Sequence, residues 1–190
     1  MHEINDQEIQ EIVQRVVRQS MGQTPKVQSD CNESNRVVVA LGTDHGGVDL
    51  KEILKVFLQE DGYEVIDVGT HTTDSVDYPD IALKVAELVA SGKACRGIII
   101  DGAGIGSCMA ANKVPGVRAA LCYDYATAVN SREHNNANTL TLGAGLIGTN
   151  LAKQIVKTWL ETPFGGGRHA RRVDKITAIE NRFSKDGKAA

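Results

Sequence analysis

The residues best suited to chemistry lie in a glycine-rich turn that follows an apolar run. Residues 98–100 are isoleucines, Asp101 follows them, and glycines stand at positions 102, 104 and 106. This layout predicts a carboxylate at the end of a buried strand, beside the backbone N–H groups of a helix N-terminus, where open α/β sheets bind anionic ligands. The pattern indicates a base that faces an anionic substrate. Because Asp is also a common N-cap residue, capping of the next helix is the competing interpretation.

A second polar segment follows the first apolar run of the same kind. Asp44 and His45 are followed by Gly46 and Gly47, and small residues let a backbone approach a ligand closely. We expect both side chains at the same sheet edge as Asp101, with capping of the next helix as the alternative for Asp44.

Two basic segments complete the set of candidates. His134 ends a helical stretch within a polar run, which we expect at the surface near the same edge, where it could move protons near neutral pH. Arg168, Arg171 and Arg172 follow three glycines. This is either a flexible hinge that carries a phosphate clamp or a solvated basic tail, since guanidinium binds phosphate oxygens in a bidentate fork.

Composition limits the classes of protein to consider. The 190 residues are 42% hydrophobic with a formal net charge of −3, which indicates a globular protein and marks no nucleic-acid or membrane surface. The four cysteines have no CxxC spacing, so a zinc site or disulfide framework is not expected and cytoplasmic thiols are the default. No apolar run has the length of a membrane span, and no secretory signal is visible.

Apolar runs and helical patterns alternate from residue 36 onward. This alternation predicts an α/β fold in which a parallel five-stranded sheet is covered by helices on both faces. We expect strands at residues 37–41, 64–68, 97–100, 117–122 and 138–142, and helices at residues 48–59, 81–90, 105–112, 126–133 and 151–160.

The two ends of the chain differ from this central part. Asn5 and Glu8 form a capping box, and an apolar stripe from Ile9 to Met21 predicts an amphipathic helix within residues 1–22. Residues 23–35 are predicted to be a flexible linker. The central domain then spans residues 36–182, with a short helix near 173–181 and a disordered tail at 183–190.

These motifs together resemble the type B ribose-5-phosphate isomerases and the related galactose-6-phosphate isomerase subunits. The resemblance is carried by residues 44–47 with the following Leu50 and Lys51, and by residues 75–80, 102–106, 110–116, 131–135 and 166–172. It implies a Rossmann-like, flavodoxin-like sheet and a homodimer, sometimes paired into a tetramer, with active sites shared between subunits. It implies no metal and no other cofactor.

The resemblance also implies roles for individual residues. His134 helps to open the sugar ring across the dimer interface, and His45, Arg168 and Arg172 are phosphate ligands. Asp44 and Tyr78 contact the sugar. Asp101 stands where the family has its base, and we expect its carboxylate to form the cis-enediolate between ribose 5-phosphate and ribulose 5-phosphate. The remaining catalytic or substrate-binding positions are Gly102, Ala103, Gly104, Gly106 and Asn135.

Three departures from the family pattern leave alternatives open. Much of the family has a cysteine at the position of Asp101, a threonine at that of Ala103 and an arginine at that of Gly145. The alternatives are a non-catalytic sugar-phosphate-binding subunit and an isomerase of another sugar phosphate, such as a hexose 6-phosphate.

The N-terminal segment resembles the encapsulation peptides of bacterial microcompartment enzymes. Its apolar stripe could bind a shell or core protein through residues 5–21, which would place the enzyme inside a microcompartment in the cytoplasm. Docking of the same helix on its own domain is an equal alternative, because an amphipathic stripe reports only that something covers it.

Overall fold

The computed structural model describes residues 37–184 of the chain. The predicted targeting helix and the linker lie outside these residues. Strands and helices alternate as the sequence predicts: β1 (Val38–Thr43), α2 (Val48–Glu60), β2 (Glu64–Asp67), α3 (Tyr78–Ala90), β3 (Arg96–Asp101), α4 (Ile105–Ala111), β4 (Ala119–Leu121), α5 (Tyr125–Glu133), β5 (Thr139–Gly143), α6 (Thr149–Glu161) and α7 (Gly167–Ser184).

The strands form one five-stranded sheet in the order β2-β1-β3-β5-β4, and every pairing is parallel. The predicted α/β fold with a parallel sheet is therefore confirmed. After β1 the chain adds β2 on one side of it. It then adds β3 on the other side of β1, and β5 and β4 lie beyond β3. This reversal lies between the carboxyl ends of β1 and β3, and such a point is where open α/β sheets bind their ligands.

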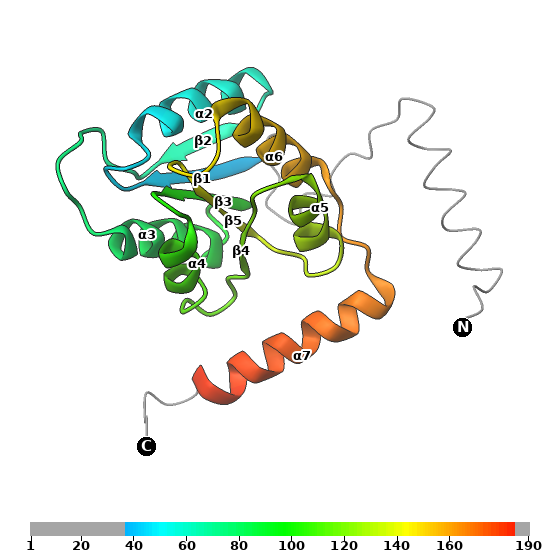
Figure 1. Ribbon diagram of the computed structural model, residues 1–190. Coiled ribbons are helices and arrows are strands. Elements are labelled where there is room, and N and C mark those ends of the chain that lie inside the picture. The colour runs from blue at the N-terminus through cyan, green and yellow to red at the C-terminus, as the bar shows by residue number, and fades with distance from the viewer. Residues whose placement is uncertain (1–36, 185–190) are drawn as a thin grey trace, which may run out of the picture.

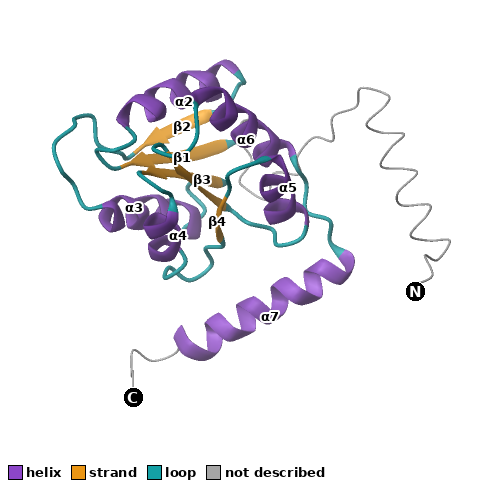
Figure 2. Ribbon diagram, viewed as in Figure 1, coloured by secondary structure: helices purple, strands orange, loops and turns teal. Residues whose placement is uncertain are grey.

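Helices cover both faces of the sheet (Figures 1 and 2). Successive strand residues point to opposite faces, so Ile98 and Ile100 pack with α2, α5 and α6. Ile99 packs with α3 and α4 on the other face. Burial on both faces explains why the central strand β3 is an almost unbroken apolar run.

Helix α7 lies outside these layers in Figure 1. It starts at Gly167 and ends at Ser184, so it is longer than the predicted helix at 173–181 and includes two residues predicted to be a disordered tail. Its far end contacts the body of the protein, because the Gly116 N–H donates to the Glu180 carboxylate at 3.0 Å. The C-terminal arginines are therefore helical and do not belong to a flexible hinge.

Candidate active site

The loops that follow β1 and β3 meet at the point where the strand order reverses. Asp44 N–H donates to the Ile100 carbonyl oxygen at 3.3 Å, which joins the two strand ends. A Cβ atom at Gly46 would lie 3.7 Å from the Gly102 nitrogen. The structure therefore brings Asp44, His45 and the glycine turn to one sheet edge, as the sequence predicts.

Asp101 lies at the centre of this edge and is only 4% exposed. Its Oδ1 accepts the N–H of Ala103 at 2.8 Å and also the N–H of Gly104, while its Oδ2 accepts the N–H of Ser107 at 3.0 Å. Gly104, and not Asp101, is the N-cap of α4, but the bond to Ser107 satisfies an N–H group in the first turn of that helix as a cap would. The carboxylate thus closes the β3–α4 loop and binds two of the amides that the sequence offered for the enediolate.

The backbone of this loop is packed too tightly for side chains at two glycines. Gly104 has φ of 77° and is the N-cap of α4, and a Cβ there would lie 2.5 Å from Leu121 Cδ1. A Cβ at Gly143 would lie 2.7 Å from the Ala103 carbonyl. Tyr123, which sequence reasoning missed, donates its hydroxyl to the Ala103 carbonyl oxygen at 2.6 Å, so the loop is held from both sides.

Asp44 and His45 have different surroundings. The Asp44 side chain is nearly buried, and its Oδ1 accepts the Gly46 N–H at 2.9 Å. Helix α2 begins at Gly47 without a side-chain cap, so the capping alternative for Asp44 is wrong. His45 is exposed, and its Nδ1 accepts the Val76 N–H at 3.3 Å. In that tautomer the proton is on Nε2, which can donate to an anion.

Tyr78 reaches the same edge from the start of α3. A Cβ at Gly106 would lie 2.5 Å from Tyr78 Cε2 and Cζ, so the ring lies flush against the first turn of α4. The ring remains 41% exposed, and its hydroxyl can meet a ligand at this edge.

His134 and Asn135 lie at the opposite edge of the sheet, which corrects the sequence-based expectation. Helix α5 follows β4 and returns the chain to the amino ends of the strands, where β5 starts at Thr139. Asp101 pairs with Gly143 at the carboxyl end of β5. That strand has five residues, so the two edges are roughly 13 Å apart.

The basic residues of α7 gather around His134. Its ring stacks on that of His169, with centroids 4.2 Å apart and planes 5° from parallel. Burial, and then the charges of His134, Arg168 and Arg172, lower the pKa of His169 below its usual value. Arg168 and Arg172 are exposed. This second group of side chains is positively charged and suited to a phosphate, but in a single chain it does not face Asp101.

A thiol near the glycine turn does not replace the family's cysteine. Cys108 lies on α4, and its thiol donates to the Ala119 carbonyl oxygen of β4 at 3.4 Å. Burial raises the pKa of this thiol, so it is protonated at neutral pH. The only acidic side chain at the end of β3 is Asp101.

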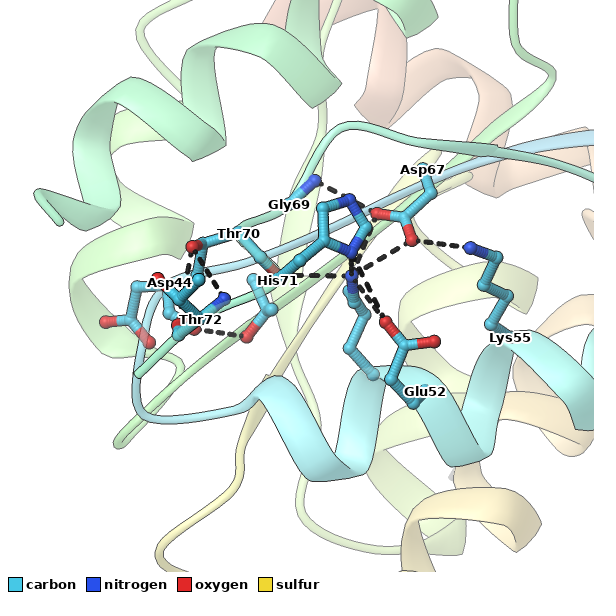
Figure 3. Close-up of polar contacts among 10 residues, drawn as sticks. Asp44, Glu52, Lys55, Asp67, Gly69, Thr70, His71 and Thr72 are labelled. Carbon is cyan, nitrogen blue, oxygen red and sulfur yellow. Dashed lines mark hydrogen bonds and ion pairs between the residues drawn. The ribbon is translucent and has the colours of Figure 1, made fainter. Parts of the chain in front are cut away.

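One group of residues in the described part of the chain has the composition of a metal site. Side-chain atoms of Glu52, Asp67 and His71 lie within 4.8 Å of one another, and Figure 3 shows the three side chains converging. However, Lys51 Nζ lies 2.8 Å from Glu52, 3.0 Å from Asp67 and 3.0 Å from His71. An ammonium therefore already takes the position of a cation.

A cavity of about 380 Å³ adjoins His45. It lies between the N-terminal ends of α2 and α6, and Thr73 of the β2–α3 loop closes one side. Its wall includes Gly46, Ala144 and Gly148, which are small residues. The candidate site is therefore open on the side where His45 would bind a phosphate.

Comparison with known proteins gives consistent matches. Residues 39–176 match the family model described as Ribose/Galactose Isomerase. Ribose-5-phosphate isomerase B of Escherichia coli (strain K12) is 46% identical over 144 residues, which cover 76% of this chain and 97% of the relative.

Solved structures agree with the sequence relatives. The Clostridium thermocellum ribose-5-phosphate isomerase B superposes with a TM-score of 0.76 at 55% identity, covering 77% of this chain and 99% of that one. The Mycoplasma genitalium ribose-5-phosphate isomerase B with bound ribulose-5-phosphate has a TM-score of 0.74 at 40% identity, covering 76% and 97% of the two chains.

Proposed function

Because this chain belongs to the ribose/galactose isomerase family, we propose that it interconverts ribose 5-phosphate and ribulose 5-phosphate through a cis-enediolate. The observation that carries the proposal is the meeting of the β1 and β3 loops, which puts Asp44, His45 and Asp101 at one sheet edge. Tyr78 joins them from α3. The edge holds an acidic group, a ring N–H donor and a phenol, which suit a polyhydroxylated phosphate ester.

In this proposal two subunits complete each site. His134, Asn135, Arg168 and Arg172 lie at the opposite edge of the sheet from Asp101, so a single chain cannot bring both groups to one small molecule. A homodimer, alone or paired into a tetramer, would place His134 and the arginines of one subunit against Asp101 of the other. The arginines and His45 would bind the phosphate, and His134 would assist ring opening.

Asp101 is the proposed base for transfer of the proton between C1 and C2. Its Oδ1 accepts two N–H groups, whereas its Oδ2 accepts one, so Oδ2 keeps a lone pair for a proton. A carboxylate does comparable work in triosephosphate isomerase. The N–H groups of Ala103 and Gly104 are engaged by Asp101, and we assign Gly102 and Gly106 as the donors for the enediolate oxygen.

The same contacts of Asp101 favour a second candidate function, a sugar-phosphate-binding chain without turnover. A carboxylate that is 4% exposed and accepts three backbone N–H groups also serves as a purely structural cap. Ala103 lacks the hydroxyl that much of the family has at this position.

A coupled assay of ribulose 5-phosphate formation, run beside calorimetric binding of ribose 5-phosphate, tests the proposal. Turnover supports the isomerase, and binding without turnover supports the second candidate. An assay of ketose phosphate formation from galactose 6-phosphate tests for another sugar phosphate. Higher kcat/KM on a hexose phosphate than on ribose 5-phosphate would contradict the assignment of the pentose.

For the N-terminal segment we propose targeting to a bacterial microcompartment. The support is the sequence pattern, in which the capping box and the apolar stripe precede a polar linker. The matched family region starts at residue 39, so this segment is an addition to the isomerase domain. A fluorescent reporter fused to residues 1–35 should form foci in a compartment-forming host, and diffuse fluorescence there would contradict the proposal.

A further inference from the structure

The most deeply buried charge outside the candidate site is the ammonium of Lys51. This residue lies in the first turns of α2, and its side chain is 0% exposed. Its Nζ lies 3.2 and 3.0 Å from the two oxygens of Asp67, 3.1 Å from the Thr70 carbonyl oxygen and 3.0 Å from His71 Nδ1. A charge is retained in such a place only when its partners satisfy it.

These partners come from the strand end and the loop between β2 and α3. Asp67 ends β2, and it also accepts the Gly69 N–H at 3.1 Å. Thr70 and His71 begin the loop, and the Thr70 N–H donates to the Thr43 carbonyl oxygen at the end of β1. A Cβ at Gly69 would lie 3.1 Å from Lys51 Cδ. The loop is thus packed directly on the lysine stem.

The far end of the same loop belongs to the candidate site. Val76 N–H donates to His45 Nδ1 at 3.3 Å, and Tyr78 begins α3 two residues later. Residues 72–75 between the two attachment points are exposed and bond mainly to one another. The loop that Lys51 binds at its start therefore contacts His45 through Val76 and leads directly into Tyr78.

We infer that Lys51 is a positioning residue, whose buried ammonium fixes the β2–α3 loop and through it orients His45 and Tyr78 for the sugar phosphate. The inference rests on the proposed function for the identity of that ligand. Lys51 itself lies beneath the loop and touches no substrate.

The arrangement of charges explains why an ammonium serves this purpose. Lys51 and Lys55 are balanced by Asp67 and Glu52, and Lys55 Nζ lies 2.9 Å from Asp67. His71 Nδ1 faces the ammonium, so it acts as the acceptor, with its proton on Nε2. Of the two lysines only Lys51 bonds to the loop backbone, at the Thr70 carbonyl oxygen, because Lys55 is bonded to Asp67 alone in the cluster's hydrogen bonds. Asp67 adds a second attachment, since it accepts the Gly69 N–H.

Variants of the full-length chain test the inference. Lys51→Met keeps most of the stem and removes the ammonium, and His71→Ala removes a loop contact from a side chain that is 62% exposed. Lys55→Met is the matched control, since it removes the other cation on Asp67 and leaves the loop contacts in place. Hydrogen exchange of the free protein and steady-state kinetics with ribose 5-phosphate are measured for each.

We expect amide exchange in residues 69–77 to rise by at least about tenfold in Lys51→Met while β3 and β5 keep their protection. KM for ribose 5-phosphate should rise by about tenfold, with kcat changed much less, because His45 loses its alignment with the phosphate. His71→Ala should show the same pattern in smaller measure, and Lys55→Met should match the wild type in both.

Unchanged exchange in the loop, or faster exchange without a change in KM, would overturn the inference. If Lys51→Met does not fold, loop exchange and KM are compared between His71→Ala and Lys55→Met. The inference holds if both quantities rise in His71→Ala alone, and it is overturned if the two variants behave alike. If the wild type has no turnover, the proposed isomerase fails separately, and the affinity for ribose 5-phosphate replaces KM. A wild type that neither binds nor converts this sugar overturns both.

Discussion

The carboxylate of Asp101 and the backbone N–H of Ser107 are joined at 3.0 Å, across the turn from β3 into α4. The two residues are six positions apart, so the bond closes the whole turn between them. Asp101 also accepts the N–H of Ala103 within the turn. The side chain best placed to act as a base is therefore also the anchor of the loop around it. Substitutions at this position must separate the two roles.

Asp101→Cys is expected to keep measurable isomerase activity and to lose stability. A thiol has the family's usual reactivity at this position but cannot accept the three N–H groups, so unfolding free energy should fall by about 1–2 kcal/mol. Activity should rise toward a thiol pKa of about 8.5 instead of staying level from neutral pH. Urea unfolding and a pH–rate profile measure both effects.

Asp101→Asn is the matched comparison, because its carbonyl oxygen can still accept N–H groups while it cannot take a proton as a base. We expect an intact fold and a loss of turnover of at least about 100-fold. Near-wild-type turnover in this variant would show that Asp101 is only a cap.

Ala103→Thr is expected to raise kcat with little effect on KM. The methyl group lies in the loop closed by Asp101, and a threonine hydroxyl there adds a donor near the reacting carbons. One such donor stabilises the transition state by up to about 3 kcal/mol. We expect only part of this, an increase of about tenfold in kcat. Ala103→Val has the same shape without the hydroxyl and should give no increase.

The sequence was sufficient to predict the edge that carries Asp44 and Asp101. Residues that follow parallel strands all lie at the carboxyl edge, so apolar runs that end in Asp101 or precede Asp44 place them there whatever the loop details. The expected position of His134 near that edge of its own chain was wrong for the same topological reason. It follows a helix, and each helix returns the chain to the amino edge, where β5 begins at Thr139.

The Lys51 network had no signal of comparable strength in the sequence. Lys51 is 16 positions from Asp67 and 20 from His71 along the chain. Asp67 stands at the end of a predicted strand and Lys51 follows the motif at 44–47, but neither pattern indicates that these side chains meet. The length of α7 was also missed, because the glycines at 165–167 suggested a hinge that would leave the arginines flexible. In the structure Gly166 and Gly167 have positive φ and the helix follows at once.

Asp67→Asn should lower the free energy of unfolding at neutral pH. It should also make that free energy depend less on pH in the acid range. Burial opposes the charge on Asp67, but hydrogen bonds from Lys55 and Lys51 outweigh it and hold the pKa below its usual value of 3.8. A lowered pKa in the folded state contributes stability above that value, which is lost as pH falls through the folded-state pKa. We expect a loss of about 3 kcal/mol at pH 7, since Lys51 keeps its charge without its main partner.

The check is urea unfolding of wild type and variant at several values of pH. The difference in unfolding free energy between wild type and variant should narrow below about pH 4, where Asp67 of the unfolded wild type takes up a proton. Asp61→Asn, at an exposed carboxylate after α2, is the control and should follow the wild type throughout. A difference of the same size at pH 3 and pH 7 would contradict the role given to the ionised Asp67.

A mixture of two inactive variants, Asp101→Asn and His134→Asn, should regain activity if each site takes Asp101 from one subunit and His134 from the other. The two residues lie at opposite edges of the sheet in one chain, so neither variant alone has a complete site. When the chains are unfolded, mixed equally and refolded, random pairing makes half of the dimers mixed. One of the two sites in a mixed dimer contains both defects and the other contains neither, so the mixture should reach about a quarter of wild-type turnover. Sites built within single chains would give no recovery, whereas the pure variants refolded separately control for any gain from refolding. Recovery near a quarter would therefore locate His134 in its partner's site without any structure of the complex.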